Sequence, residues 1–173
     1  MTIDQAILKE VLTYEEETGN FLWRKALNRK IKVGTVAGYT DPEKYIRIKL
    51  FGKVYKAHNL VWLYFHGEFP ENLLDHKDKN PGNNKKDNLR PCTPSQNIAN
   101  REGFKNKSSV FKGVNWNKSR RKWRSHIKIL GKQFYLGSFD KELDAAKAYD
   151  KAAFKYFGEF AVLNFGEKDD RPT

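Results

Sequence analysis

The chain has 173 residues, 39% of them hydrophobic and 14% aromatic, which is enough apolar material to fold as one ordinary domain or two small ones. Its formal net charge of +12 favours a polyanionic partner such as nucleic acid over an acidic small molecule. A single cysteine, Cys92, excludes an intramolecular disulfide framework and a cysteine-based zinc site, and no apolar run approaches the 18 residues of a membrane span.

The first 70 residues predict a helix, a set of hairpins and a second helix. The segment 3–12 has apolar residues at helical spacing, with Thr2 or Asp4 as its cap. Small antiparallel hairpins are expected next, because short apolar stretches alternate with turn residues. The expected turns are Thr18-Gly19-Asn20 and Gly52-Lys53. Residues 58–66 then form an apolar helical face that ends at Gly67.

Residues 73–97 are rich in Asp, Asn, Lys and Gly, so they build no core and are a candidate site. Adjacent Asp75 and His76 are followed by Asn88 and Asn97. Carboxylate and amide oxygens suit magnesium, and a histidine that titrates near neutrality suits proton removal from water. These are the parts of a metal-assisted phosphodiesterase. The alternative is a polar surface loop folded by Asx turns, which Asp and Asn form for purely local reasons.

A helix start and a linker separate this site from the second half of the chain. Thr93 followed by Pro94 predicts a capped helix, so Asn97 lies one turn into it and can pack against the end of the strand bearing Asp75. Residues 99–109 combine glycine, asparagine and serine with basic side chains and predict a basic linker between two domains.

Residues 103–139 carry ten basic and no acidic side chains, interleaved with aromatic and aliphatic residues. A run of this composition folds, and its basic face indicates a phosphate-binding surface. The alternating pattern predicts one basic strand face and one apolar face, with a turn at Gly131-Lys132. The residues assigned to the basic face are Arg124, His126 and Lys128, and those assigned to the core are Trp123, Phe134 and Leu136.

A helix is expected to cover the back of this sheet. Asp140 is its predicted cap, and the helix runs to about Phe157. Its alanines, among them Ala145 and Ala146, allow close packing on the sheet. The polar tail that follows Gly166 is expected to be loose.

The candidate site resembles a known family of enzymes. The residues that carry the resemblance are Leu73-Leu74-Asp75-His76-Lys77-Asp78-Lys79-Asn80, Asn84, Asn88-Leu89-Arg90 and Gln96-Asn97. They closely resemble the HNH, or His-Me finger, homing endonucleases of phages, and the likeness spans roughly residues 10–100. In that family the fold is a ββα-metal finger. The resemblance implies that His76 is the general base, that Asp75 and Asn97 hold one divalent cation, magnesium or manganese, and that Asn88 steadies the loop and the orientation of His76.

Two further residues take a role from the same resemblance. Relatives commonly have His-Arg where this chain has His58-Asn59, so His58 is either structural or a phosphate contact. Arg90 is the other possible phosphate contact. The last position of the finger carries Asn97 and not histidine, which points away from zinc.

A second resemblance covers residues 108–165. It is carried by Phe111-Lys112-Gly113-Val114-Asn115-Trp116, Leu136-Gly137-Ser138-Phe139-Asp140, Ala148-Tyr149-Asp150 and Leu163-Asn164-Phe165. These are similar to the plant ethylene-response-factor (APETALA-family) DNA-binding domain, in which a three-stranded sheet lies in the major groove and a helix supports it. The positions that the resemblance implies to face DNA are Asn115, Asn117, Arg124, His126, Lys128 and Tyr135.

Chemistry divides the roles on this surface. Arg124 suits a guanine edge, and Asn115 or Asn117 suits an adenine edge. The side chains better suited to phosphate are Lys112, Lys118, Arg120, Arg121 and Lys132. The family usually has arginine at two positions where this chain has Asn115 and Asn117, so the sequence preference need not follow the family.

Together these observations predict an α+β protein, with N-terminal hairpins and a ββα-metal (HNH) finger followed by a three-stranded antiparallel sheet packed on one helix. The expected parts are an HNH nuclease domain over 1–98, a basic linker over 99–109, a DNA-binding domain over 110–166 and a tail over 167–173. The expected function is a metal-dependent DNA endonuclease that hydrolyses phosphodiester bonds, docked on double-stranded DNA by its C-terminal sheet.

No membrane and no obligatory protein partner are expected. The chain is expected to act in the cytoplasm, which is that of the host cell if the chain is phage-encoded, and not to be secreted. Two alternatives stay open. One is a non-catalytic phage regulator that binds DNA and keeps the finger as a scaffold, and the other is a nonspecific, toxin-like nuclease.

Overall fold

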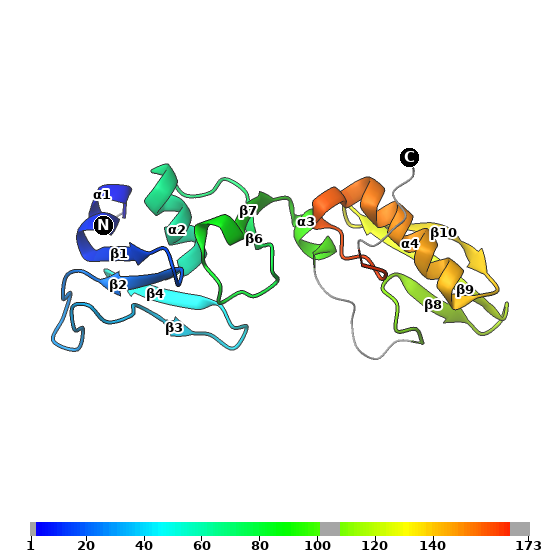
Figure 1. Cartoon of the computed structure of the whole chain (residues 1–173), viewed down its shortest axis with the longest axis horizontal. Coiled ribbons are helices and arrows are strands. Elements are labelled where there is room, and N and C mark those ends of the chain that lie inside the picture. Colours follow the sequence, from blue (N-terminus) through cyan, green and yellow to red (C-terminus); the bar gives the residue numbers. More distant parts are fainter. Residues whose placement is uncertain (1–2, 101–107, 167–173) are drawn as a thin grey trace. The chain divides into compact units, whose positions relative to one another are not determined.

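The computed structural model describes residues 3–100 and 108–166, which form two compact units that divide between Cys92 and Thr93 (Figure 1). The α+β fold class is confirmed, since both units combine helices with antiparallel sheets. Most of the expected linker 99–109 and all of the expected tail 167–173 lie outside the described residues, so the domain bounds stay predictions. Within the described residues, no helix is long and apolar enough to cross a membrane.

The described residues of the first unit form three small antiparallel sheets, two α-helices and a 3-10 helix (Lys86–Asn88). Its elements are α1 (Gln5–Val11), β1 (Leu12–Glu15), β2 (Asn20–Trp23), β3 (Tyr39–Thr40), β4 (Ile46–Leu50), β5 (Lys53–Lys56), α2 (Ala57–His66), β6 (Leu73–His76) and β7 (Leu89–Cys92). Strand β1 pairs with β2, strands β3, β4 and β5 form a sheet in that order, and β6 pairs with β7. The predicted hairpins are therefore confirmed.

The caps predicted for the first two helices are confirmed. Asp4 is the N-cap of α1, and its Oδ1 accepts a hydrogen bond from the Ile7 amide at 2.8 Å. Helix α2 ends at Gly67, whose φ of 83° lies in the left-handed region that favours glycine at this position. Both caps satisfy backbone groups that a helix end leaves unpaired.

The predicted positions of two hairpin turns are wrong, because each turn begins one residue earlier in the chain than predicted. The chain turns at Phe51-Gly52, with φ values of 48° and 83°, and at Leu130-Gly131, with values of 48° and 80°. Both turns therefore have positive φ at both central positions, as a type I′ turn requires. Glycine occupies the second of these positions, whereas the predicted turns at Gly52-Lys53 and Gly131-Lys132 placed it first.

Aromatic side chains hold the core of the first unit together. The ring of Tyr14 packs edge to face against Phe21 and Phe65, with centroids 5.4 and 5.2 Å apart. Tyr64 of α2 joins them from the helix side, 5.7 Å from Phe21. Such pairs contribute about 0.5–1.5 kcal/mol each beyond the area they bury. The packing fixes α2 against the β1–β2 hairpin.

The second unit is a three-stranded sheet with a helix on one face, as predicted. Its elements are α3 (Pro94–Ala99), β8 (Val114–Asn117), β9 (Lys122–Ile129), β10 (Lys132–Phe139), α4 (Glu142–Phe157) and a 3-10 helix (Gly158–Phe160). The antiparallel strand order is β10-β9-β8. Helix α4 buries Ala145 and Ala146 completely against the sheet. A Cβ added at Gly113 would lie 1.9 Å from the Tyr149 ring, so only glycine lets β8 approach this helix.

Two residues of the second unit differ from their predicted roles. Lys141, not Asp140, is the N-cap of α4, and Asp140 instead pairs with Lys122 of β9 at 2.7 Å. Phe134 was assigned to the core, but 47% of it is exposed. Its partner in the register is Ile127, which is buried, so Phe134 has the core parity but lies on an edge strand.

Candidate active site and nucleic-acid interface

The candidate active site is built on the β6–β7 hairpin, in which Asp75 pairs with Arg90 and His76 with Leu89. The side chains of Asp75 and His76 belong to the last two residues of β6, just before the polar loop 77–85. Asp75, His76 and Arg90 are 6%, 5% and 9% exposed. Charged and ionisable groups are seldom so buried without partners, so their contacts decide what the site can do.

Asp75 and Arg90 form a buried ion pair. The Arg90 Nε and Nη2 atoms lie 3.1 and 3.0 Å from Oδ2 of Asp75. Both contacts reach the same carboxylate oxygen. The pair holds the Asp75 side chain in one orientation, as a metal ligand needs. Arg90 contacts Asp75 in this structure. Its predicted contact with phosphate stays a prediction.

His76 is held by a side chain of the loop that follows it. Its Nε2 lies 3.2 Å from Oδ1 of Asn84, which is only 2% exposed. Burial lowers the pKa of the His76 imidazole, although the Asn84 hydrogen bond acts in the opposite direction. The imidazole is therefore neutral at physiological pH, the form in which it can accept a proton.

Asn88 ties the loop together through three contacts. It belongs to a 3-10 helix (Lys86–Asn88), and its Oδ1 accepts a hydrogen bond from the Asp78 amide at 3.1 Å. Its Nδ2 donates to Oδ1 of Asp78 at 2.9 Å and to the Asn83 carbonyl at 2.8 Å. These contacts support the role predicted for Asn88, that of steadying the loop beside His76.

Asx turns also shape this loop, as the alternative interpretation expected. The Asn80 amide donates to Oδ1 of Asp78 at 2.9 Å, and the Gly82 amide donates to Oδ1 of Asn80 at 3.1 Å. Local turn chemistry thus accounts for the exposed residues Asp78 and Asn80. It does not account for the buried pair of His76 and Asn84.

The β1–β2 hairpin supports the loop from the other side. The Tyr14 hydroxyl donates to the Asn84 carbonyl at 3.0 Å and accepts from the Lys86 amide at 2.9 Å. Burial raises the pKa of Tyr14, so the hydroxyl keeps its proton. A Cβ added at Gly19 would lie 2.5 Å from the Lys85 amide nitrogen, which shows how closely the hairpin turn approaches the loop.

His58 of α2 lies against the catalytic candidate. Its ring centroid is 5.1 Å from that of His76 in an edge-to-face contact, and the Tyr45 ring lies 5.6 Å from His58 and 6.1 Å from His76. Burial, with smaller contributions from His76 and Lys56, lowers the pKa of His58 to about 3. A side chain that is 4% exposed and neutral favours the structural role over a phosphate contact.

The expected metal ligands come from the two different units. Asn97 lies in α3, whose capping box of Thr93 and Gln96 confirms the predicted helix start. Asp75 belongs to the first unit and Asn97 to the second, so their pairing stays a prediction. No cluster of three His, Cys, Asp or Glu side chains suited to a metal occurs in the described part of the chain. The predicted donor set, a carboxylate and an amide oxygen, still suits a hard cation.

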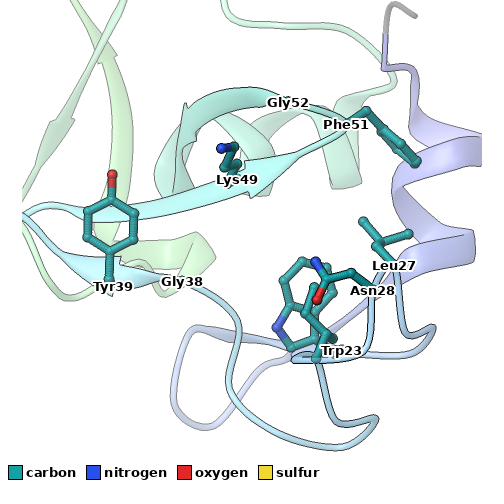
Figure 2. Close-up of a pocket in the computed structure, with 9 residues that line it drawn as sticks. Trp23, Leu27, Asn28, Gly38, Tyr39, Lys49, Phe51 and Gly52 are labelled. Atoms are coloured by element: carbon teal, nitrogen blue, oxygen red, sulfur yellow. The ribbon is translucent and has the colours of Figure 1, made fainter.

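A separate groove of about 420 Å³ opens on the first unit. Figure 2 shows Phe51 and Leu27 toward one end of it and Tyr39 toward the other. Its lining residues are Trp23, Leu27, Asn28, Ile31, Gly38, Tyr39, Lys49, Phe51 and Gly52. None of them is a predicted site residue. The lining includes no His, Asp, Glu or Cys, so the groove has neither an imidazole base nor a carboxylate ligand of the kind found at His76 and Asp75.

The basic face predicted on the second unit is confirmed by the strand register. Asn115 pairs with Arg124, and His126 pairs with Tyr135, so these side chains share one face of the sheet. Ser125 and Ile127, which alternate with them, are buried. The predicted contacts that are exposed are Lys118, Arg120, Arg121, Arg124, Lys128, Lys132 and Tyr135, while Asn115, Asn117 and His126 are half-buried.

Several side chains of this surface are already engaged. The Arg124 guanidinium lies over the Tyr135 ring at 5.6 Å, which orients it without neutralising its charge. Oδ1 of Asn117 accepts from the Ser119 hydroxyl at 2.8 Å and from the Arg120 amide at 3.2 Å, so it stabilises the β8–β9 turn. Asn115 is consequently the better of the two candidates for an adenine edge.

Lys112 differs from the other basic residues. It is half-buried, and its Nζ donates to the Ala99 carbonyl at 2.5 Å. The Lys112 amide donates to Oδ1 of Asn164 at 2.6 Å. These bonds indicate that Lys112 joins α3 to the start of the sheet. The phosphate role predicted for Lys112 stays a prediction.

Sequence reasoning gave no role to Asn84, Tyr14 or Tyr45. Asn84 is one of six asparagines between residues 80 and 100, and no local pattern separates it from the others. Tyr14 is 70 residues from the carbonyl that it binds. The one available signal was the resemblance, which included Asn84 without assigning it a function.

Comparisons with known proteins agree with both resemblances. The HNH endonuclease family matches residues 55–99, and the AP2 domain family matches residues 109–159. Protein 3.8 of Escherichia phage T7 is 38% identical over 93 residues, which cover 53% of this chain and 77% of that protein. These matches place the two sequence families on the two halves of the chain.

Plant proteins match only through part of their length. The AP2-like ethylene-responsive transcription factor TOE2 of Arabidopsis thaliana is 47% identical over 73 residues, 42% of this chain and 15% of that protein. APETALA2-like protein 2 of Oryza sativa subsp. indica is 45% identical over 69 residues, 40% of this chain and 16% of that protein. The chain thus spans about a sixth of the length of these plant relatives.

A solved structure described as DNA binding and cleavage by the HNH homing endonuclease I-HmuI is also similar. It is 30% identical in sequence, with 51% of this chain and 50% of that chain covered, and the TM-score is 0.39.

Proposed function

The chain belongs to the HNH endonuclease family and carries an AP2 domain behind its HNH segment, and on this basis we propose that it is a metal-dependent DNA endonuclease. The observation that carries the proposal is the His76 imidazole, which is buried, neutral and held by Asn84 at the end of β6. It stands next to Asp75, whose carboxylate is held by Arg90. A base and an oxygen ligand on adjacent residues suit phosphodiester hydrolysis.

His76 acts in this proposal as the general base. It removes a proton from the attacking water, whose oxygen forms the new bond to phosphorus while the bond to the 3′ oxygen breaks. The products are a 3′-hydroxyl and a 5′-phosphate. Asn88 keeps the loop in place during this step, because its three hydrogen bonds join both sides of the loop.

The proposed cofactor is one divalent cation, magnesium or manganese, held by Asp75 and Asn97. Both side chains offer hard oxygen ligands, and the Arg90 contact fixes the Asp75 carboxylate. A cation held by these two residues would supply Lewis-acid chemistry, polarising the scissile phosphate and stabilising the charge on the leaving oxygen. One cation suffices because a histidine, and not a second metal, supplies the base.

The second unit binds double-stranded DNA in this proposal. The basic face of its sheet presents Arg124 and Lys128 to solvent, while α4 packs on the opposite face. Arg124 has the two donors that a guanine edge requires, and Asn115 suits an adenine edge. The phosphate contacts proposed around them are Lys118, Arg120, Arg121 and Lys132. Arg124, Asn115 and these cations together set where on the DNA the first unit cuts.

Incubation of the whole chain with supercoiled plasmid and Mg²⁺ tests the proposal. We expect nicked circles that DNA ligase reseals without end treatment, because the products carry a 3′-hydroxyl and a 5′-phosphate. EDTA is expected to abolish the reaction. Retarded but uncut plasmid at every Mg²⁺ and Mn²⁺ concentration would instead establish the DNA-binding regulator. Cut sites scattered over the whole plasmid would favour the nonspecific nuclease.

A further inference from the structure

Asn84 holds His76 in a way that identifies which ring nitrogen carries the proton. The side-chain amide of Asn84 has one accepting oxygen and one donating nitrogen. Its Nδ2 donates to the Gly82 carbonyl at 3.3 Å, which fixes the oxygen on the side of His76. An amide oxygen only accepts, so the 3.2 Å contact is a hydrogen bond when Nε2 of His76 carries the proton.

We propose that Asn84 is a positioning residue that keeps a proton on Nε2 of His76 and so leaves Nδ1 as the atom that accepts the proton from water. This inference rests on the proposed nuclease function and deepens it. Neutral imidazole has one donating and one accepting nitrogen, so a partner that fixes one of them determines the other. Asn84 is suited to the task because it is 2% exposed and water cannot compete for the bond.

Tyr14 extends this arrangement to the β1–β2 hairpin. Its hydroxyl binds the carbonyl of Asn84 and the amide of Lys86, so it holds the backbone on both sides of Lys85. Tyr14 is itself 8% exposed within the aromatic core. The β1–β2 hairpin therefore fixes the position of the loop. Tyr14 binds the backbone of Asn84, and the side chain of Asn84 contacts His76.

The tautomer of His76 in the whole chain is the direct readout. Long-range ¹H–¹⁵N spectra of histidine-labelled protein at pH 7.5 distinguish a proton on Nε2 from a proton on Nδ1, and His76→Gln assigns the signals. We expect the Nε2-protonated form in the wild type. Asn84→Leu removes the acceptor and should give a mixture of tautomers, whereas Asn84→Asp keeps an oxygen in place and should keep the wild-type form.

Single-turnover cleavage at saturating DNA supplies the second readout. Asn84→Leu should lower the rate by about 10- to 100-fold, the usual effect of removing a partner that orients a catalytic group, with DNA affinity unchanged. Asn84→Asp should recover most of this rate. Tyr14→Phe removes one hydroxyl and should lower the rate less. The matched control is Tyr64→Phe, since Tyr64 packs on Tyr14 and its hydroxyl makes no hydrogen bond among the described residues.

The two proposals fail in different ways. A wild-type proton on Nδ1, or a tautomer that Asn84→Leu leaves unchanged, would overturn the role of Asn84 even in an active enzyme. A chain that never cuts DNA but shows the expected tautomers would overturn the nuclease and support the positioning contact. Should Asn84→Leu not fold, Asn84→Ser takes its place, because the shorter side chain cannot span the same distance to His76.

Discussion

The two units differ in the burial of the charged and ionisable side chains proposed to function. In the first, Asp75 and Arg90 are buried together and His76 is neutral. In the second, Arg124 and Lys128 are exposed on a strand with no acidic residue. Burial fixes the position of a reacting group but carries a desolvation penalty, whereas an exposed cation avoids the penalty and stays available to a phosphate. Catalysis and DNA binding therefore need different environments, and in this chain the residues proposed for the two functions lie in different units.

Removal of the proposed base should give the largest effect and separate the two functions most sharply. His76→Ala is expected to lower cleavage by about a thousandfold or more, because general-base catalysis contributes on the order of 10²–10⁴-fold. DNA affinity should stay within about twofold of the wild type, since the basic sheet is unchanged. Plasmid nicking and electrophoretic shifts measure the two quantities. A variant in which both decline together, while still folded by thermal melting, would place His76 in the DNA interface.

One ion pair from each unit, Asp75 with Arg90 and Asp140 with Lys122, allows a direct test of how burial changes the contribution of an ion pair to stability. Arg90→Met removes the buried partner of Asp75 and should lower the free energy of unfolding by about 3–5 kcal/mol. Lys122→Met removes the partner of Asp140, whose side chain is 81% exposed, and should cost less than about 1 kcal/mol. Urea denaturation followed by circular dichroism measures both. Equal destabilisation in the two variants would contradict the difference between the units.

The lowered pKa of His58 predicts how the stability of the first unit depends on pH. Its folded pKa of about 3 lies below the ordinary value of 6.5, so the unfolded chain binds the proton more readily. Stability should therefore fall as the pH drops below about 6.5, by about 2 kcal/mol from this residue between pH 7 and pH 5. His58→Gln should make this fall in stability shallower. His66→Gln is the matched control, because it removes a histidine of the same helix that is exposed beside Trp62.

Local signals in the sequence predicted much of the fold. The caps at Asp4, Gly67 and Thr93 set three helix ends, and each is confirmed. Strand alternation placed Arg124 and Lys128 on the open face of the sheet. Each of these predictions depends on residues a few positions apart, where spacing alone fixes geometry. The predicted positions of the two glycine turns were wrong, because glycine suits either central position of a hairpin turn and only the pairing register distinguishes them.

The inner part of the candidate site could not be predicted in the same way. The contact of Asp75 with Arg90 depends on the register of two strands, and the contact of Tyr14 with Asn84 joins segments 70 residues apart. Nothing local marks Asn84 among its neighbouring asparagines. The family resemblance supplied roles for His76 and Asn88, but not the side chain that orients the imidazole. The contact of Asn84 with His76 spans eight residues of one loop, and Tyr14 holds that loop from 70 residues away, so neither contact leaves a periodic signature in the sequence.

The smallest effect is expected on the exposed face, where charges act additively. Replacing Lys128 and Arg121 by glutamine should lower the slope of log affinity against log salt by about 1.8, because each lysine or arginine bound to a phosphate contributes about 0.9 to that slope. Doubling the salt concentration should then weaken the variant about threefold less than the wild type. The control replaces Lys147 and Lys151 by glutamine, because these exposed residues of α4 carry the same charge away from the basic face.

Fluorescence anisotropy with a short DNA duplex at four salt concentrations measures these slopes. Cleavage at saturating DNA should be unchanged in the double variant, because His76 and its partners lie in the other unit. Equal slopes for the sheet and helix variants would mean that net charge alone attracts DNA and that the sheet has no defined phosphate contacts. A lower slope only in the sheet variant would locate the contacts on β9 and the β8–β9 turn, where Lys128 and Arg121 lie.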